Sequence, residues 1–156
     1  GDIVVAEHGR KSVVGYDANG DETTVYASGL GAPTGLVVDG DDLFVSDRAT
    51  GQILQIAAAG AVLTKPKVVI AGLTTPEGFV KLESAFAVVE ADLGQVTIAG
   101  ADDSNRVVAN IPPGAQAASA QQPPSQVFNG ITADETGTLF VAGESNRVLY
   151  KISNAL

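Results

Sequence analysis

The apolar residues of this chain lie in short runs that alternate with polar turn residues. Short runs rich in Val, Ile and Phe, bounded by Gly and Asp, are typical of β-strands joined by tight turns. One stretch has the runs Gly35 to Val38, Leu43 to Val45, Gln52 to Ile56 and Val68 to Ala71, separated by Asp39-Gly40-Asp41, Thr50-Gly51 and Ala59-Gly60. This stretch predicts four strands joined by turns, and strong helix signals are missing throughout the chain.

The same pattern returns along the chain as a tandem repeat. Pro33-Thr34-Gly35 recurs as Pro76-Glu77-Gly78 and, in a degraded form, as Phe128-Asn129-Gly130. The segment from Asp2 to Glu7 matches the segment from Asp42 to Asp47 with a shift of 40 positions. A period of about 40 to 45 residues is that of a propeller blade. The predicted fold class is therefore all-β, a β-propeller of four-stranded antiparallel blades.

Four such units can be counted, and the units at the two ends are incomplete. They span residues 1–30, 31–73, 74–111 and 127–156, with a proline-rich loop at 112–126. The first unit lacks an innermost strand and the fourth an outermost strand, which leaves 14 strands. That number is too small to close a ring of blades that hides its sheet edges. We therefore expect either further blades in a longer polypeptide or closure of the ring by copies or by a partner chain.

Two of these segments carry a family resemblance. The stretch from Gly29 to Asp47 and the stretch from Phe128 to Val141 resemble blades of the NHL-repeat, gluconolactonase-like (senescence marker protein-like) superfamily. The resemblance implies a six-bladed ring. It leaves the function open, because lactonases, lyases, strictosidine synthase-like proteins and non-catalytic binding modules share the motif, and one fold hosts many functions.

The resemblance also implies a set of tunnel-lining residues. In the gluconolactonase and paraoxonase branches, the residue before the glycine that opens the innermost strand points into the central tunnel, where acidic or amide side chains bind a divalent cation. Here these positions are Thr34, Glu77 and Asn129. Glu77 and Asn129 offer the oxygen ligands that calcium prefers, whereas Thr34 departs from the family pattern. Two interpretations stay open: a calcium site at Glu77 and Asn129, or a wet channel mouth that the three residues line.

A second set of acids stands at the ends of the second strands, in front of the hairpins. Its members are Glu7, Asp47 and Glu90, with Asp92 close behind. A carboxylate at such a place accepts hydrogen bonds from turn amides and stabilises the hairpin. The predicted role of these acids is structural.

No catalytic motif of high specificity occurs in the sequence. His8 is the only histidine and follows Glu7, so a general base is one interpretation, but its place in a hairpin favours an exposed surface residue. There is no Ser/His/Asp order, zinc spacing, phosphate-binding glycine loop or dinucleotide fingerprint. If the chain is an enzyme, the resemblance implies a metal-dependent hydrolase of the lactonase or esterase type.

Composition narrows the range of partners. The net charge is −9 over 156 residues, which argues against nucleic acid and favours a cation or a positively charged surface. No apolar run is long enough to cross a bilayer. The chain has no cysteine, which removes disulfides and zinc thiolate sites. We expect an extracellular or periplasmic location.

Three classes of function stay open. The first is a propeller-type binding module for a small ligand, a cation or a protein partner, with the loop at 112–126 partly covering the ligand site. The second is a calcium-dependent lactonase-like hydrolase, in which Glu77 and Asn129 hold the metal. The third is a structural protein whose open sheet edges join end to end.

Overall fold

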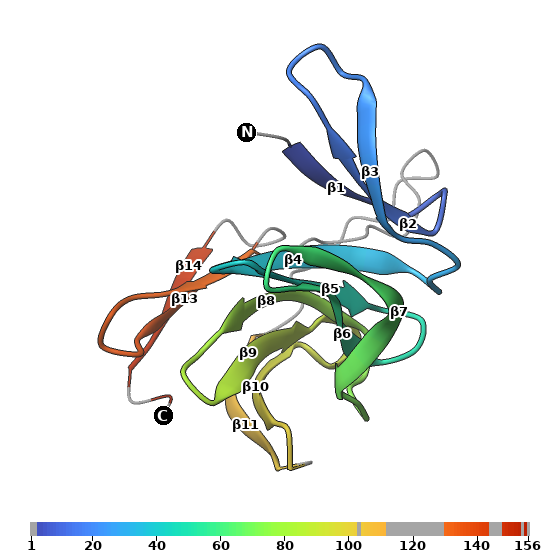
Figure 1. Ribbon diagram of the computed structural model, residues 1–156. Coiled ribbons are helices and arrows are strands. Elements are labelled where there is room, and N and C mark those ends of the chain that lie inside the picture. Colours follow the sequence, from blue (N-terminus) through green and yellow to red (C-terminus); the bar gives the residue numbers. More distant parts are fainter. Residues whose placement is uncertain (1–2, 103, 112–129, 144–147, 154, 156) are drawn as a thin grey trace, which may run out of the picture.

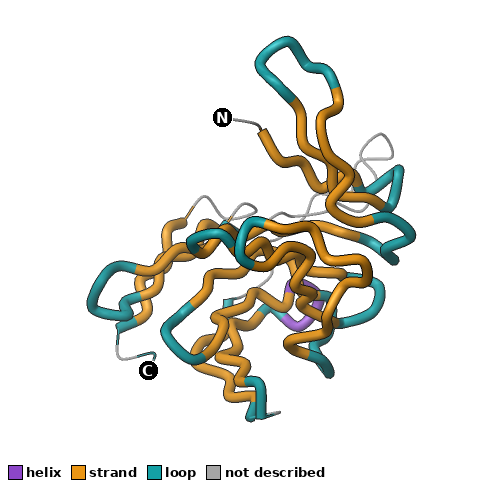
Figure 2. The backbone as a smooth tube through the Cα atoms, in the orientation of Figure 1, coloured by secondary structure: helices purple, strands orange, loops and turns teal. Residues whose placement is uncertain are grey.

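The computed structural model describes residues 3–102, 104–111, 130–143, 148–153 and 155 (Figure 1). Within these residues the chain forms fourteen strands and one short 3-10 helix, η1 (Ala91–Leu93). The strands form four antiparallel sheets, and each sheet takes consecutive strands of the chain. Figure 2 shows how little of the backbone lies outside strands and the turns between them. The prediction of an all-β chain, a partial β-propeller of antiparallel blades, is confirmed.

The first and last sheets have three described strands each. The first sheet consists of β1 (Ile3–Glu7), β2 (Ser12–Tyr16) and β3 (Glu22–Ala27). The last consists of β12 (Ile131–Ala133), β13 (Leu139–Gly143) and β14 (Val148–Ile152).

The two middle sheets have four strands each, paired in chain order. The second sheet consists of β4 (Pro33–Asp39), β5 (Asp42–Asp47), β6 (Gln52–Ala58) and β7 (Ala61–Ile70). The third consists of β8 (Pro76–Lys81), β9 (Ala85–Glu90), β10 (Gln95–Gly100) and β11 (Asn105–Asn110). The first strands β4, β8 and β12 follow one another in space, with β4 beside β8 and β8 beside β12. This row forms the inner side of the partial propeller.

Successive side chains of the central strands point alternately toward the two neighbouring sheets. In β5, Leu43 and Val45 pack with Val13 of the first sheet, whereas Phe44 packs with Phe79 and other residues of the third. Successive residues of a strand point to opposite faces, so a sheet with neighbours on both sides is apolar on both faces. This explains why β5 is buried almost from end to end.

The strand β9 repeats this division one sheet further on. Phe86 and Val88 face the second sheet, and Ala87 and Val89 face the fourth. The ring of Phe86 lies 5.4 Å from that of Phe44 in an edge-on arrangement. Burial of each large apolar side chain contributes about 1.5–3 kcal/mol, and aromatic pairs add to this. The three junctions between consecutive sheets therefore hold three apolar cores.

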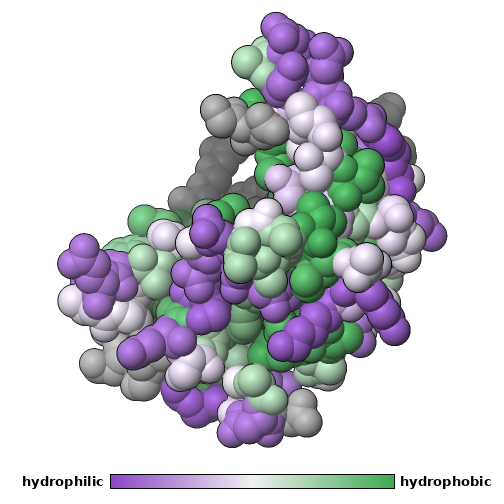
Figure 3. Space-filling view, in the orientation of Figure 1, coloured by the Kyte–Doolittle hydropathy of each residue, from purple (hydrophilic) through white to green (hydrophobic). Residues whose placement is uncertain are grey.

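The two outer faces of the array keep apolar side chains in contact with solvent. Ile3 is 63% exposed and Val25 is 52% exposed on the first sheet, and Leu149 of the last sheet is 67% exposed. In Figure 3 polar residues cover the turn between β2 and β3 at the top of the view, and apolar residues appear below it. Within the described residues, the two outer faces thus lack the neighbour that each middle sheet has on both sides.

Some predictions concern residues that the structure does not describe. The predicted proline-rich loop at 112–126 and Asn129 lie outside the described residues, as do residues 144–147. The described part of the chain holds no helix of the length and apolarity that a membrane span requires.

Candidate ligand-binding site

The strands β4 and β8 begin side by side and bring Thr34 and Glu77 together. The hydroxyl of Ser46 on β5 donates to the carbonyl oxygen of Glu77 at 2.7 Å and accepts from the amide of Gly35 at 2.8 Å. The hydroxyl of Thr34 donates to the carbonyl oxygen of Pro76 at 3.2 Å. A Cβ on Gly35 would collide with the Glu77 carbonyl oxygen, so this close approach of two backbones requires glycine.

The side chain of Glu77 is buried and forms an ion pair across the junction between the second and third sheets. Glu77 as a whole is 1% exposed. Its Oε1 lies 3.4 Å from Nε of Arg48, which stands in the turn after β5. The contact is an ion pair without hydrogen-bond geometry at the buried Nε atom. A buried carboxylate needs a compensating charge because desolvation of an ion is costly, and Arg48 supplies that charge.

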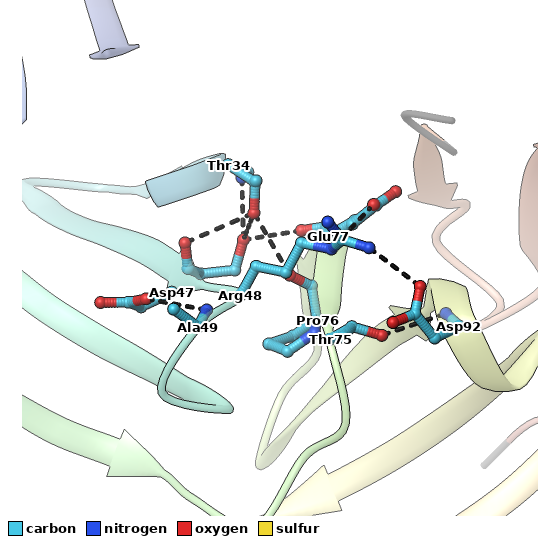
Figure 4. A network of polar contacts seen from close by, with 10 residues as sticks. Thr34, Asp47, Arg48, Ala49, Thr75, Pro76, Glu77 and Asp92 are labelled. Atoms are coloured by element: carbon cyan, nitrogen blue, oxygen red, sulfur yellow. Dashed lines mark hydrogen bonds and ion pairs between the residues drawn. The ribbon is translucent and has the colours of Figure 1, made fainter. Parts of the chain in front are cut away.

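The other end of the Arg48 guanidinium reaches an exposed carboxylate. Nη2 of Arg48 donates to Oδ1 of Asp92 at 2.9 Å. The side chain of Asp92 is 58% exposed and that of Arg48 is 27% exposed. The amide of Asp92 donates to the hydroxyl of Thr75 at 3.0 Å, which fixes this part of η1. Figure 4 shows Arg48 extending from the second sheet between the two acids of the third.

The acid at the end of β5 binds the backbone that enters β4. Asp47 is 1% exposed and accepts from the amides of Gly31 at 2.7 Å and Ala32 at 2.8 Å. It also accepts from the amides of Ala49 and Thr50 in its own turn. Charge-assisted hydrogen bonds of this kind are strong. Asp47 therefore orients the turn from which Arg48 projects.

Glu90 and Glu7 stand at the corresponding places of the third and first sheets. Glu90 accepts from the amide of Thr74 at 2.6 Å, and from the side chains of Gln95 and Thr97. Glu7 accepts from the hydroxyl of Tyr16 at 2.6 Å and lies next to Arg10. A further donor to Glu7 is the hydroxyl of Ser12.

The hydrogen bond between Glu7 and Tyr16 changes the pKa of both side chains. Donation from the Tyr16 hydroxyl is the main cause that lowers the pKa of the Glu7 carboxyl. The same hydrogen bond raises the pKa of Tyr16, because ionisation would remove the donated proton. His8 lies next to this pair in the exposed turn between β1 and β2. Among the described residues, no contact joins the His8 side chain to Arg48, Glu77 and Asp92, the Arg48 cluster.

The calcium prediction depends partly on a residue that the structure does not describe. Of the three tunnel-lining positions, Thr34 and Glu77 lie together, and Asn129 falls outside the described residues. Calcium takes six to eight oxygen ligands. Among the described residues, no group of three or more His, Cys, Asp or Glu side chains is arranged to hold a metal ion. The Glu77 carboxylate meets Arg48 instead, so a calcium ion there would have to compete with a guanidinium.

The role of Arg48 was not predicted from the sequence. Its neighbour Asp47 is one of the repeated acids, and the repeat places Arg48 opposite His8 of the first unit and Ala91 of the third. Because the residue at this position differs from unit to unit, the repeat gave no signal that singles out Arg48. The sequence places Asp92 close to a hairpin. Its contact with Arg48, which joins two sheets, could not be predicted from that position.

Comparison with solved structures supports the fold. The chain matches virginiamycin B lyase from Staphylococcus aureus with 14% identity and a TM-score of 0.65, over 99% of this chain and 50% of the lyase. A catalytically inactive variant of that lyase, solved with quinupristin, matches with 13% identity and the same TM-score, over 99% of this chain and 50% of the variant. An auxiliary nutrient binding protein from Bacteroides thetaiotaomicron matches with 17% identity and a TM-score of 0.66, over 98% of this chain and 45% of that protein.

These likenesses concern the fold. The chain spans about half the length of the solved structures it matches. A scan against models of protein families finds no match, and a search of curated proteins finds none. The residues of the Arg48 cluster therefore have to be interpreted from their own geometry.

Proposed function

We propose that this chain is a binding module of the propeller type, whose ligand contacts the polar groups where β4 and β8 begin. The observation that carries the proposal is the ion pair between Arg48 and the buried Glu77, which joins two sheets at the inner side of the array. A buried ion pair adds little net stability compared with apolar packing. Its presence beside an apolar core is better accounted for by a binding role than by folding.

Three charged side chains, those of Arg48, Glu77 and Asp92, converge where the second and third sheets meet. Small-molecule sites contain a few convergent polar groups of this kind. Arg48 leaves the turn that Asp47 fixes, and Asp92 is fixed through its backbone contact with Thr75. The similar solved structures include a virginiamycin B lyase with quinupristin and an auxiliary nutrient binding protein. Both are compatible with a ligand site on this fold.

The proposal also includes the blades that would complete a propeller ring. We expect the chain to contribute blades to a six-bladed propeller of the NHL-repeat, gluconolactonase-like type, with the remaining blades supplied by the same polypeptide or by another chain. The exposed Ile3, Val25 and Leu149 on the two outer sheets support this expectation, because large apolar side chains on a sheet face favour a covering layer.

A calcium-dependent lactonase-like hydrolase is the second candidate. The observation in its favour is the buried carboxylate of Glu77 at the start of an innermost strand. In that scheme the metal would polarise a substrate carbonyl. The position of Arg48 against the same carboxylate favours the binding module over the hydrolase.

A thermal-shift screen tests the binding proposal. A panel of small polar compounds (amines, carboxylates, amides and polyols) is added to the wild-type chain and to Arg48→Lys and Asp92→Asn. Ligands that bind the folded state raise Tm by mass action. We expect the compounds that raise Tm of the wild type to lose this effect in both variants.

The matched controls are Arg10→Lys and Glu22→Gln, which alter an exposed arginine–carboxylate pair on the first sheet, with 2.6 Å between Nη1 and Oε1. These controls should keep the response of the wild type. Equal responses in all five proteins would show that the Arg48 cluster is not the binding site.

A further inference from the structure

The pair formed by Arg48 and Asp92 joins a donor group to an acceptor group, and the two side chains are 27% and 58% exposed. Nε of Arg48 faces Glu77, and Nη2 of Arg48 donates to Oδ1 of Asp92. Among the described residues, no hydrogen bond or ion pair involves Nη1 of Arg48 or Oδ2 of Asp92. The guanidinium is a planar group of donors, and an ionised carboxylate only accepts. A ligand at this edge therefore meets one donor next to one acceptor.

The charges around this edge disfavour ligands with a net charge. An anion that approaches Arg48 also approaches Asp92 and Glu77, in a chain whose net charge is −9. A cation that approaches Asp92 meets the guanidinium of Arg48 at 2.9 Å from Oδ1. Like charges at such short range repel, and the effect is strong where water is partly excluded. A neutral group that both accepts and donates avoids each of these costs.

The two polar groups are held in place before any ligand arrives. Arg48 is fixed at its inner edge by the buried Glu77, and its exposed fraction is 27%. The backbone amide of Asp92 is held by the hydroxyl of Thr75, and its carboxylate accepts from Nη2 of Arg48. Groups that are already ordered lose less entropy on binding, so a preorganised pair gains affinity. The pair also joins the second sheet to η1 of the third.

We propose that the exposed edge of the Arg48–Asp92 pair binds the neighbouring hydroxyl groups of a neutral polyol or saccharide. One oxygen of a vicinal diol accepts from Nη1 of Arg48, and the adjacent hydroxyl donates to Oδ2 of Asp92. The inference rests on the proposed function, because it specifies the ligand class of the same site. It extends that proposal by excluding simple anions and cations as the preferred ligands.

The test uses small probes and a titration followed by the backbone amide signals of the intact chain in NMR. The probes are cis-1,2-cyclohexanediol, cyclohexanol, acetate and methylammonium. A site that pairs with two hydroxyls discriminates strongly against an analogue that lacks one. We expect the diol to shift the signals of Ala49 and Asp92 and to bind at least about tenfold more tightly than cyclohexanol.

Two variants and two controls complete the experiment. Asp92→Asn places an amide, which offers a donor, at the predicted acceptor, and Arg48→Lys removes the planar edge. Each should weaken diol binding at least about tenfold, whereas Arg10→Lys and Glu22→Gln should leave it unchanged. Because Asp92 is 58% exposed, Asp92→Asn should fold normally even if a change at Arg48 leaves Glu77 without its cation.

The outcomes separate this inference from the proposed function. Binding of cyclohexanol as tight as that of the diol, or diol binding that survives Asp92→Asn, would overturn the inference. Acetate or methylammonium binding at Ala49 and Asp92 in the absence of diol binding would overturn it too, while leaving the binding module in place. If none of the four probes shifts these signals, the diol inference is wrong, and the thermal-shift panel alone decides the proposed function.

Discussion

Asp47 in the second sheet and Glu7 in the first stand at the same place in the repeat, yet their carboxylates have different partners. Asp47 is 1% exposed and binds backbone amides, including those of Gly31 and Ala32 ahead of β4. The side chain of Glu7 is 19% exposed and takes its hydrogen bonds from side chains such as that of Tyr16. The acid at this repeat position therefore binds backbone amides in one sheet and side chains in the other.

The difference follows from the strand that enters each sheet. The segment before β4 brings unpaired amides to Asp47, and the segment before β8 brings the amide of Thr74 to Glu90. The described part of the first sheet begins with β1 and contains no corresponding innermost strand. Glu7 then binds nearby side chains. In the second and third sheets, where an entering backbone is present, these acids bind its amides.

The largest loss in the free energy of unfolding is expected when Asp47 is replaced. Asp47→Ala leaves the amides of Gly31 and Ala32 without their acceptor. An unsatisfied buried donor costs about 1–3 kcal/mol, so we expect the free energy of unfolding to fall by about 3 kcal/mol. Denaturant unfolding measures this loss. Asp47→Asn keeps one acceptor oxygen and should lose less, so equal losses in the two variants would contradict this explanation.

Glu90 provides the intermediate case. Glu90→Ala removes the acceptor of the Thr74 amide and of the Gln95 and Thr97 side chains. The Gln95 amide group keeps its contact with the Thr97 hydroxyl at 3.4 Å. We expect a loss of about 1–2 kcal/mol in the free energy of unfolding, smaller than that of Asp47→Ala. A loss larger than that of Asp47→Ala would break the proposed order.

The smallest loss among the three acids is expected for Glu7→Gln, and it should depend on pH. The pKa of Glu7 is lowered in the folded state, chiefly by the Tyr16 hydroxyl. Its contribution to stability is therefore present above the pKa of an unfolded glutamate, and it is lost as the pH falls through the lower pKa of the folded state. Unfolding of wild type and Glu7→Gln is compared at neutral and acidic pH. A difference that grows in acid would contradict this sign.

The smallest difference between wild type and variant is expected in the response of Tm to calcium. Because Arg48 lies against Glu77, we expect added calcium to change Tm equally in the wild type and in Glu77→Gln. Differential scanning calorimetry with calcium and then with a chelator measures this. The hydrolase candidate predicts the opposite result, a calcium-dependent rise in Tm that Glu77→Gln abolishes.

The sequence predicted the fold because its signals were local and repeated. Runs such as Leu43 to Val45 are bounded by turn residues, and the repeat of Pro33-Thr34-Gly35 at Pro76 gave the period of one blade. The alternation of Leu43, Phe44 and Val45 between two cores follows from the same strand pattern. These features need only the geometry of a single strand and its turns.

The site was harder to predict because its contacts join distant parts of the chain. The repeat pointed to Thr34 and Glu77, which the structure brings together. It gave no reason to connect Arg48 with Asp92, 44 positions later, because that contact depends on how two sheets pack. A side chain at a position that varies between the units, such as that of Arg48 against His8 and Ala91, is informative only when its neighbours in space are known.

The most direct test of the central claim is a map of ligand contacts on the wild-type chain. Backbone amide signals are recorded by NMR during titration with the compounds that raise Tm. The account predicts that the shifted signals cluster at Thr34, Ala49 and Asp92, which come from two sheets and meet around Arg48. Shifts confined to the hairpin between β2 and β3, or spread over the outer sheets, would contradict it.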